Sequence, residues 1–189
     1  MIRKLVMVFL GYLIPLCAVA SDVQFGVGVN TSVLGYNQDE ISGSRLFWGG
    51  HARVRFMRYV AGEVSVQRRE DSFSIRQGNI RLKTTPLQVS GIVYPLATFP
   101  VSPYFLAGTG WYYLDATVSG DLGLPYVTGE GTISHTENAY HIGAGVEAFI
   151  GRHVSLGGDV RKVFLEFDTP VIRYKVDAYM VNVGATFYF

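Results

Sequence analysis

The chain has 189 residues, of which 49% are hydrophobic and 16% are charged, and its formal net charge is +1. This length suits a single domain, and a charge so close to balance gives no support for a nucleic-acid-binding protein. The sequence contains one cysteine, Cys17, so an intramolecular disulfide is excluded.

Residues 1–20 have the pattern of a secretory signal peptide. A basic start is followed by an apolar stretch over residues 5–16 and by the small-x-small site Ala18-Val19-Ala20. We expect cleavage before Ser21, which leaves residues 21–189 as the exported domain. The alternative is an N-terminal membrane anchor, but the apolar stretch is shorter than the ~20 residues that a spanning helix requires.

The rest of the chain alternates between apolar and polar residues with the period of a β-strand. The alternating segments are long enough for the ~10 residues of a tilted membrane-spanning strand. We expect eight strands, over residues 22–36, 45–57, 61–71, 80–94, 102–117, 137–150, 153–167 and 174–189. We see no amphipathic segment of helical period between them.

The connections between these strands alternate in length. Short turns are expected near Arg58, from Pro95 and from Gly151, and the mostly longer, more polar connections are 37–44, 71–78, 119–135 and 168–173. This alternation predicts an antiparallel up-and-down meander with its short turns on one side and its long loops outside the cell. The loop within residues 117–136 holds the most external material, and it is either a binding tip or a loop without a ligand.

The two faces of each strand indicate which solvent they meet. In the segment 137–150, the apolar residues Tyr140, Ile142 and Val146 alternate with residues such as Gly143 and Glu147. Glycine weakens a strand unless another group must come close, as happens inside a narrow barrel. We therefore place the glycine and polar faces inside and the apolar faces in lipid. The alternative, a water-soluble lipocalin-like barrel, would carry Lys and Glu on its outer face.

The sequence thus predicts an all-β fold, an eight-stranded antiparallel up-and-down transmembrane β-barrel. Only a closed barrel leaves no unpaired backbone edge in hydrocarbon.

Charged residues fall on the predicted inner face together with His51 and His141. Three cations balance three anions in this set: Arg53, Arg55 and Arg161 against Glu63, Glu147 and Asp159. Charges that are shielded from water must pair, so we interpret the set as a salt-bridged network that fills the barrel. A first hairpin turning between Arg58 and Ala61 would bring Arg55 opposite Glu63. The alternative is a gated narrow path lined by these residues, although eight strands enclose barely enough room for side chains.

The segments "PYFLAGTGWYY", "AYHIGAGVEAFI", "GRHVSLGGDVRKVFLEF" and "GATFYF" resemble the family of small eight-stranded outer-membrane barrels that includes OmpX, OmpW and the opacity proteins. The resemblance covers the chain after the leader. It implies a monomer in outer-membrane lipid, with no cofactor. In this family the alternating last strand is similar to the signal that the barrel assembly machinery reads. The resemblance assigns that role to Val183, Ala185, Phe187 and Phe189.

Several functions are compatible with such a barrel. The first is a structural or surface-interaction role through external loops, which could contact host or surface ligands. The second is a narrow OmpW-like channel for small hydrophobic molecules, for which Ile92, Leu106 and Phe149 offer a partly apolar inner wall. The third is an enzyme such as a lipid A deacylase. His153 and Ser155 have the spacing of its catalytic pair but not its position along the strand, so we expect no enzyme and no metal site.

Overall fold

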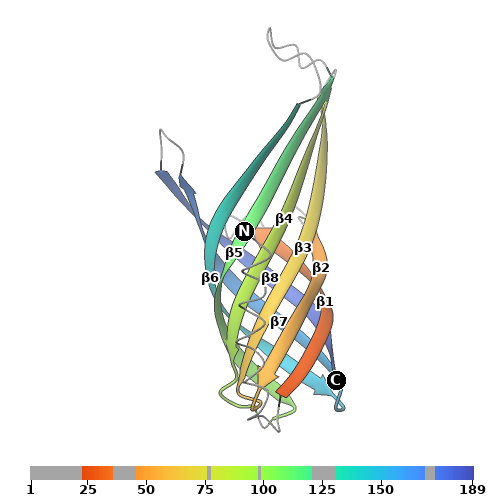
Figure 1. Cartoon of the computed structure of the whole chain (residues 1–189), viewed down its shortest axis with the longest axis vertical. Coiled ribbons are helices and arrows are strands. Elements are labelled where there is room, and N and C mark those ends of the chain that lie inside the picture. Colours follow the sequence, from red (N-terminus) through yellow and green to blue (C-terminus); the bar gives the residue numbers. More distant parts are fainter. Residues whose placement is uncertain (1–22, 36–45, 76–77, 98, 121–130, 169–172) are drawn as a thin grey trace, which may run out of the picture.

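The computed structural model describes residues 23–35, 46–75, 78–97, 99–120, 131–168 and 173–189. Within these residues, eight strands close into one antiparallel barrel in which sequence neighbours pair (Figure 1). The strands are β1 (Val23–Gly35), β2 (Leu46–Phe56), β3 (Val60–Ile75), β4 (Gly78–Val93), β5 (Val101–Gly120), β6 (Gly131–Ile150), β7 (Val154–Asp168) and β8 (Arg173–Tyr188). The predicted all-β up-and-down barrel is therefore confirmed.

The barrel is closed by pairing between its first and last strands. β1 and β8 run antiparallel from the pair of Gly26 with Tyr188 to the pair of Gly35 with Tyr179. Every strand therefore has a partner on both sides along the central part of the barrel. Over the part of the chain that is described, no helix is long and apolar enough to cross a membrane.

The short connections lie together at one end of the barrel, the lower end in Figure 1, which we call the short-turn end. They follow Phe56, Val93 and Ile150, and the C-terminus lies at the same end. The first turn is tight, because Phe56 pairs directly with Val60.

Strand lengths at the opposite end differ from the prediction. The predicted loop at 71–78 is mostly paired strand, since β3 reaches Ile75 and β4 begins at Gly78. The loop at 117–136 is likewise wrong in its bounds, because β5 runs to Gly120 and β6 begins at Gly131. Along these segments the face that continues the barrel interior carries apolar residues such as Leu82, Ala116 and Ile133, whereas the outer face is polar. The alternation is therefore the reverse of that on a lipid-facing strand. The tip at 121–130, like the predicted leader at 1–20, lies outside the described residues.

The predicted orientation of the two faces is confirmed. Large apolar side chains such as Val29 (68% exposed), Ile142 and Val183 point outward, whereas Glu147 (1%) and Arg161 (3%) are buried inside. This distribution is the reverse of that in a water-soluble protein. It matches a barrel whose outer wall faces lipid.

Glycine lets neighbouring groups approach closely on the inner face of the barrel. A Cβ atom on Gly108 would collide with the backbone carbonyl of Val89 and with the His141 ring. Gly62 points outward, and a Cβ atom there would meet nothing within 4 Å. Gly62 can therefore accept a side chain, whereas Gly108 cannot do so without movement of its neighbours.

We predict that Gly108→Ala lowers the free energy of unfolding by ~1–3 kcal/mol, because overpacking forces backbone and side chains apart. Gly62→Ala serves as the matched control and should be neutral or slightly stabilising, since it removes only glycine's extra backbone freedom. Urea unfolding in detergent micelles, followed by tryptophan fluorescence, measures both. Equal stability of the two variants would show that the inner wall has room at Gly108.

Candidate functional site: the charged barrel interior

The centre of the barrel is crossed by the guanidinium group of Arg53. Arg53 on β2 lies directly opposite Glu63 on β3, and its Nε donates to Glu63 Oε2 at 3.0 Å. Its Nη1 reaches across the interior and donates to Glu147 Oε1 on β6 at 2.9 Å. One side chain thus links a neighbouring strand to a distant one.

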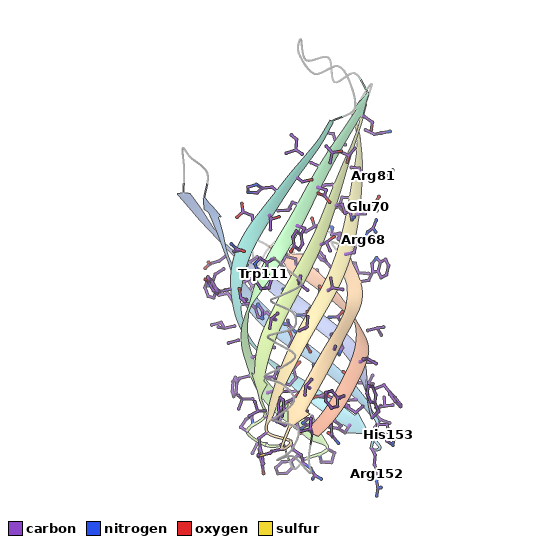
Figure 2. All side chains as sticks on the ribbon, in the orientation of Figure 1. Arg68, Glu70, Arg81, Trp111, Arg152 and His153 are labelled. Atoms are coloured by element: carbon purple, nitrogen blue, oxygen red, sulfur yellow. The ribbon has the colours of Figure 1, made fainter. Side chains whose placement is uncertain are left out.

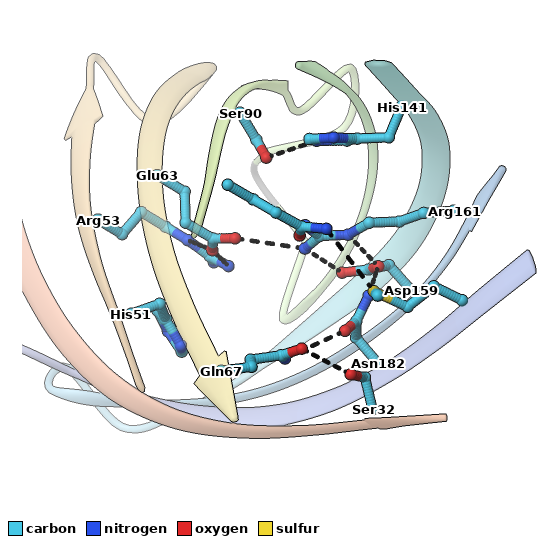
Figure 3. A network of polar contacts seen from close by, with 12 residues as sticks. Ser32, His51, Arg53, Glu63, Gln67, Ser90, His141, Asp159, Arg161 and Asn182 are labelled. Atoms are coloured by element: carbon cyan, nitrogen blue, oxygen red, sulfur yellow. Dashed lines mark hydrogen bonds and ion pairs between the residues drawn. The ribbon is translucent and has the colours of Figure 1, made fainter. Parts of the chain in front are cut away.

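Glu63 is shared with a second arginine (Figure 3). Arg161 on β7 donates from Nη2 to Glu63 Oε1 at 3.3 Å and from Nε to Asp159 Oδ1 at 2.7 Å. Its Nη1 donates to Gln88 Oε1 at 2.9 Å. Arg53, Glu63 and Arg161 therefore form a continuous chain of charges across the barrel.

Neutral donors satisfy the remaining oxygens of the carboxylates. Glu147 accepts hydrogen bonds from the hydroxyls of Ser155, Tyr94 and Tyr188. Asp159 accepts from Tyr104 at 3.0 Å and from Asn182 at 2.7 Å. All three carboxylates are buried, so these bonds are needed to offset the loss of water. We call Arg53, Glu63, Glu147, Asp159 and Arg161 the central network.

Arg55 does not belong to the central network, and its predicted pairing with Glu63 is wrong. The first turn contains three residues, 57–59, and is centred one residue earlier than predicted, so Arg55 lies opposite Ala61. Met57 and Arg58 close this turn with positive φ angles of 49° and 63°. Nothing in the sequence signals that conformation, because glycine usually occupies it.

Arg55 instead points toward the short-turn end. Its guanidinium carbon lies 4.4 Å from the ring centre of Tyr94 and 4.7 Å from that of Phe149. Its Nε and Nη2 donate to the carbonyl oxygen of Arg58 at 3.1 and 2.8 Å. The predicted balance of three against three is thus divided in space. Two arginines face three carboxylates in the centre, and one arginine stands apart.

The two inner histidines bind neutral hydroxyls. His51 Nε2 lies 2.9 Å from Thr186 Oγ1, and His141 Nε2 lies 2.9 Å from Ser90 Oγ. Both rings are buried beside the central network. They complete its polar surroundings without direct contact with a carboxylate.

The space left by the central network is small. The cavity that Arg53, Glu63, Asp159 and Arg161 line holds about 20 Å³, which is room for about one water molecule. Toward the far end, a buried apolar cluster closes the interior: Leu34, Phe47, Tyr112, Ala139, Val163, Ala178 and Met180. The interior is therefore filled from the central network to this apolar cluster rather than open.

The three residues proposed for an apolar path do not line a common one, since Phe149 lines a cavity at the short-turn end and the other two are packed. Ile92 and Leu106 belong to a packed cluster with Tyr94 and Tyr104. Neither tyrosine was singled out as a site residue from the sequence, although the alternation of residues places Tyr104 on the inner face of β5.

The candidate deacylase pair is not assembled. Ser155 is buried and bound to Glu147, whereas His153 is exposed, stacks on Phe187 and donates from Nδ1 to the carbonyl oxygen of Tyr188. Across the described part of the chain, no group of three His, Cys, Asp or Glu side chains could hold a metal ion.

The residues of the proposed assembly signal share the outer face of β8 and the chain end. Val183, Phe187 and Phe189 are exposed, and Ala185 is partly exposed. The backbone N–H of Phe189 donates to the carbonyl oxygen of Phe25 at 2.9 Å, so the last residue is fixed against β1.

We predict that Glu63→Ala lowers the free energy of unfolding by ~3–5 kcal/mol, because it leaves two buried guanidinium groups without their shared carboxylate. Combining it with Arg53→Ala should cost less than the sum of the single changes, since contacting residues are not additive. Urea titration of the four proteins measures the coupling.

The matched cycle uses Arg55→Ala in place of Arg53→Ala. Because Arg55 faces Ala61 and not Glu63, this second cycle should be close to additive. Equal coupling in the two cycles would contradict the register of β2 and β3.

Comparison with known proteins supports the fold. The profile of the outer membrane protein beta-barrel domain matches residues 8–189. Among curated proteins, no sequence matches.

Solved outer-membrane proteins have the same architecture at low sequence identity. A major outer membrane protein from Thermus thermophilus is 12% identical, covers 89% of this chain and 100% of its own, and has a TM-score of 0.63. The N-terminal β-barrel domain of Pseudomonas aeruginosa OprF is 12% identical, with 88% and 97% covered and a TM-score of 0.54. Yersinia pestis Ail, the attachment invasion locus protein, crystallised with the heparin analogue sucrose octasulfate, is 15% identical, with 88% and 97% covered and a TM-score of 0.53. Since the family profile spans nearly the whole chain, this protein belongs to the outer membrane protein beta-barrel domain family.

Proposed function

We propose that this protein is an outer-membrane barrel that presents a rigid β-sheet outside the cell and contacts surface or host ligands through it. Membership of the family assigns the chain to the bacterial outer membrane. The observation that carries the proposal is the length of four adjacent strands, which continue well beyond the closed barrel.

Strands β3 to β6 form this extension, which we call the extended sheet: residues 69–75, 78–84, 114–120 and 131–138. The β2–β3 ladder ends at the pair of Trp48 with Arg68, whereas β3 and β4 remain paired up to Ile75 and Gly78. On the other side, the β6–β7 ladder ends at Ala139, while β6 pairs with β5 as far as Gly131. Figure 1 shows the four strands rising together above the barrel.

The outer face of the extended sheet carries polar side chains that suit water. Glu70 pairs with Arg68 at 3.0 Å and with Arg81 at 3.3 Å along its outer surface (Figure 2). Ser134 donates to Asp115 at 2.7 Å on the β5–β6 hairpin. Exposed ion pairs of this kind contribute little to the stability of the fold. We therefore propose that this surface serves to contact ligands outside the cell.

Aromatic side chains support the placement of the membrane below this sheet. Trp48, Trp111 and Tyr140 are exposed near the level where the extended sheet begins. Phe99 and Phe187 are exposed at the short-turn end. Outer-membrane barrels carry aromatic girdles at both interfaces, and their short turns face the periplasm. By analogy, we place the short-turn end in the periplasm and the extended sheet outside.

The same proposal includes the route to the membrane. We propose that the leader is removed before Ser21, and that the assembly machinery reads Val183, Ala185, Phe187 and Phe189. The exposed outer face of β8 supports the latter, because a reader needs access to it. We also propose that the barrel acts as a monomer without catalytic activity.

The filled interior disfavours the alternative of a channel for small hydrophobic molecules. An apolar path needs an open apolar wall, yet Ile92 and Leu106 are packed against tyrosines. The cavity at the central network is also too small for such a molecule.

Truncation of the extended sheet tests the proposal. Replacing residues 70–83 and 115–134 by Asn-Gly turns removes Glu70, Arg81, Asp115 and Ser134 and keeps the pairs of Arg69 with Thr84 and of Leu114 with His135. A non-adherent Gram-negative strain that carries the intact barrel should adhere to heparin-coated or matrix-coated surfaces, and the truncated barrel should lose this adhesion. We choose heparin because the Ail structure contains a heparin analogue.

Two controls accompany this experiment. The truncated protein must still show the heat-modifiable gel mobility of a folded barrel. In the barrel with its full extended sheet, a cysteine at Ser134 should be labelled in intact cells, whereas one at Arg152 should not. If the intact barrel adheres no better than the empty strain, or if the truncated barrel adheres equally well, the proposed role is wrong.

A further inference from the structure

A second cavity opens at the short-turn end, outside the central network. It measures about 640 Å³ and is lined by Arg55, Arg58 and Arg152 together with apolar groups that include Phe99 and Phe149. Three arginines around one cavity indicate an anionic ligand if no carboxylate of the protein already pairs with them.

The charge of Arg55 has no carboxylate partner among the described residues. Its side chain is buried (3% exposed), yet its contacts are the carbonyl oxygen of Arg58 and two aromatic rings. Its Nη1 donates to no described residue. Arg53 and Arg161, by contrast, each bind carboxylates directly. A buried guanidinium group normally requires such an anion, so Arg55 is the feature that calls for a ligand.

The surroundings of the cavity are cationic as well. Arg58 and Arg152 form no ion pair with any described residue, and no acidic side chain occurs in the described turns 57–59, 94–97, 99–100 and 151–153. Tyr94, which lies against Arg55, donates its hydroxyl to Glu147, but that carboxylate is already bound by Arg53. The C-terminal carboxylate of Phe189 also lies at this end, and Asp22 lies outside the described residues.

The backbone of the first turn is fixed so that the arginines share this cavity. Met57 and Arg58 adopt left-handed conformations, which are unfavourable for residues other than glycine. The two hydrogen bonds from Arg55 to the Arg58 carbonyl hold the turn in this state. Such local strain is typical of a prearranged binding site.

We propose that the cavity at the short-turn end binds a phosphate group, supplied either by the headgroup of an anionic phospholipid or by a free phosphate. The planar guanidinium group presents paired donors that match phosphate oxygens. The apolar part of the wall suits the glycerol and first methylene groups of a lipid. Exposed apolar residues at the same end, such as Met57, Leu96 and Val101, bring the cavity close to lipid headgroups.

Nuclear magnetic resonance of the refolded barrel in phosphate-free octyl glucoside micelles tests this proposal. The probes are inorganic phosphate and, separately, short-chain phosphatidylglycerol, with an uncharged glyceride of the same chain length as the blank. We expect saturable shifts of the amide signals of residues 57–59 and 151–153. Saturation with both probes indicates a general phosphate site, and saturation with the lipid alone indicates a headgroup site.

Variants at exposed positions keep the test independent of folding. Arg58→Gln and Arg152→Gln should each weaken binding roughly tenfold, since each removes a charge-assisted hydrogen bond. Arg81→Gln removes the same charge from the opposite end, where its side chain is exposed, and should leave binding unchanged. The proposal is overturned if neither probe gives saturable shifts at this end, if the glyceride gives the same shifts, or if Arg81→Gln weakens binding equally.

Discussion

The interior of this barrel depends on two ion pairs that share one carboxylate. Glu63 binds both Arg53 and Arg161. It connects β2, β3 and β7, and Arg53 extends the connection to β6 through Glu147. A membrane-spanning sheet must close to satisfy its backbone, and closure of eight strands leaves a narrow interior that side chains must fill. Charges can fill that space only if each is paired and hydrogen-bonded. The tyrosine, serine and asparagine donors around the network meet this condition.

Charged side chains are distributed differently at the centre of the barrel and at its two ends, and this distribution underlies the proposed roles. The centre holds more carboxylates than arginines, whereas the short-turn end holds arginines that form no ion pair with any described residue, around an open cavity. The opposite end carries exposed ion pairs on a sheet that continues beyond the barrel. The filled centre therefore separates these two surfaces, and neither of the two proposed binding roles requires conduction through the barrel.

Much of the fold could be predicted from the sequence, because a period of two reports strands and faces directly. The inward positions of Arg53, Glu147 and Arg161 follow from that period. The contact between Arg53 and Glu147 does not, since these residues are far apart in sequence and meet only through closure. The partner of Glu63 was missed for a local reason: Met57 and Arg58 form a tight turn without glycine. The extended sheet was missed because the outer face of its strands is polar and so lacks the lipid-facing signal.

Planar-bilayer conductance of the refolded barrel, residues 21–189, tests the central claim most directly. If paired charges and the apolar cluster beyond them fill the interior, the wild-type protein should give no steady ionic current at neutral pH. Stable, reproducible single-channel steps from the wild-type barrel would contradict the account, because a cavity of about 20 Å³ at the central network cannot conduct hydrated ions.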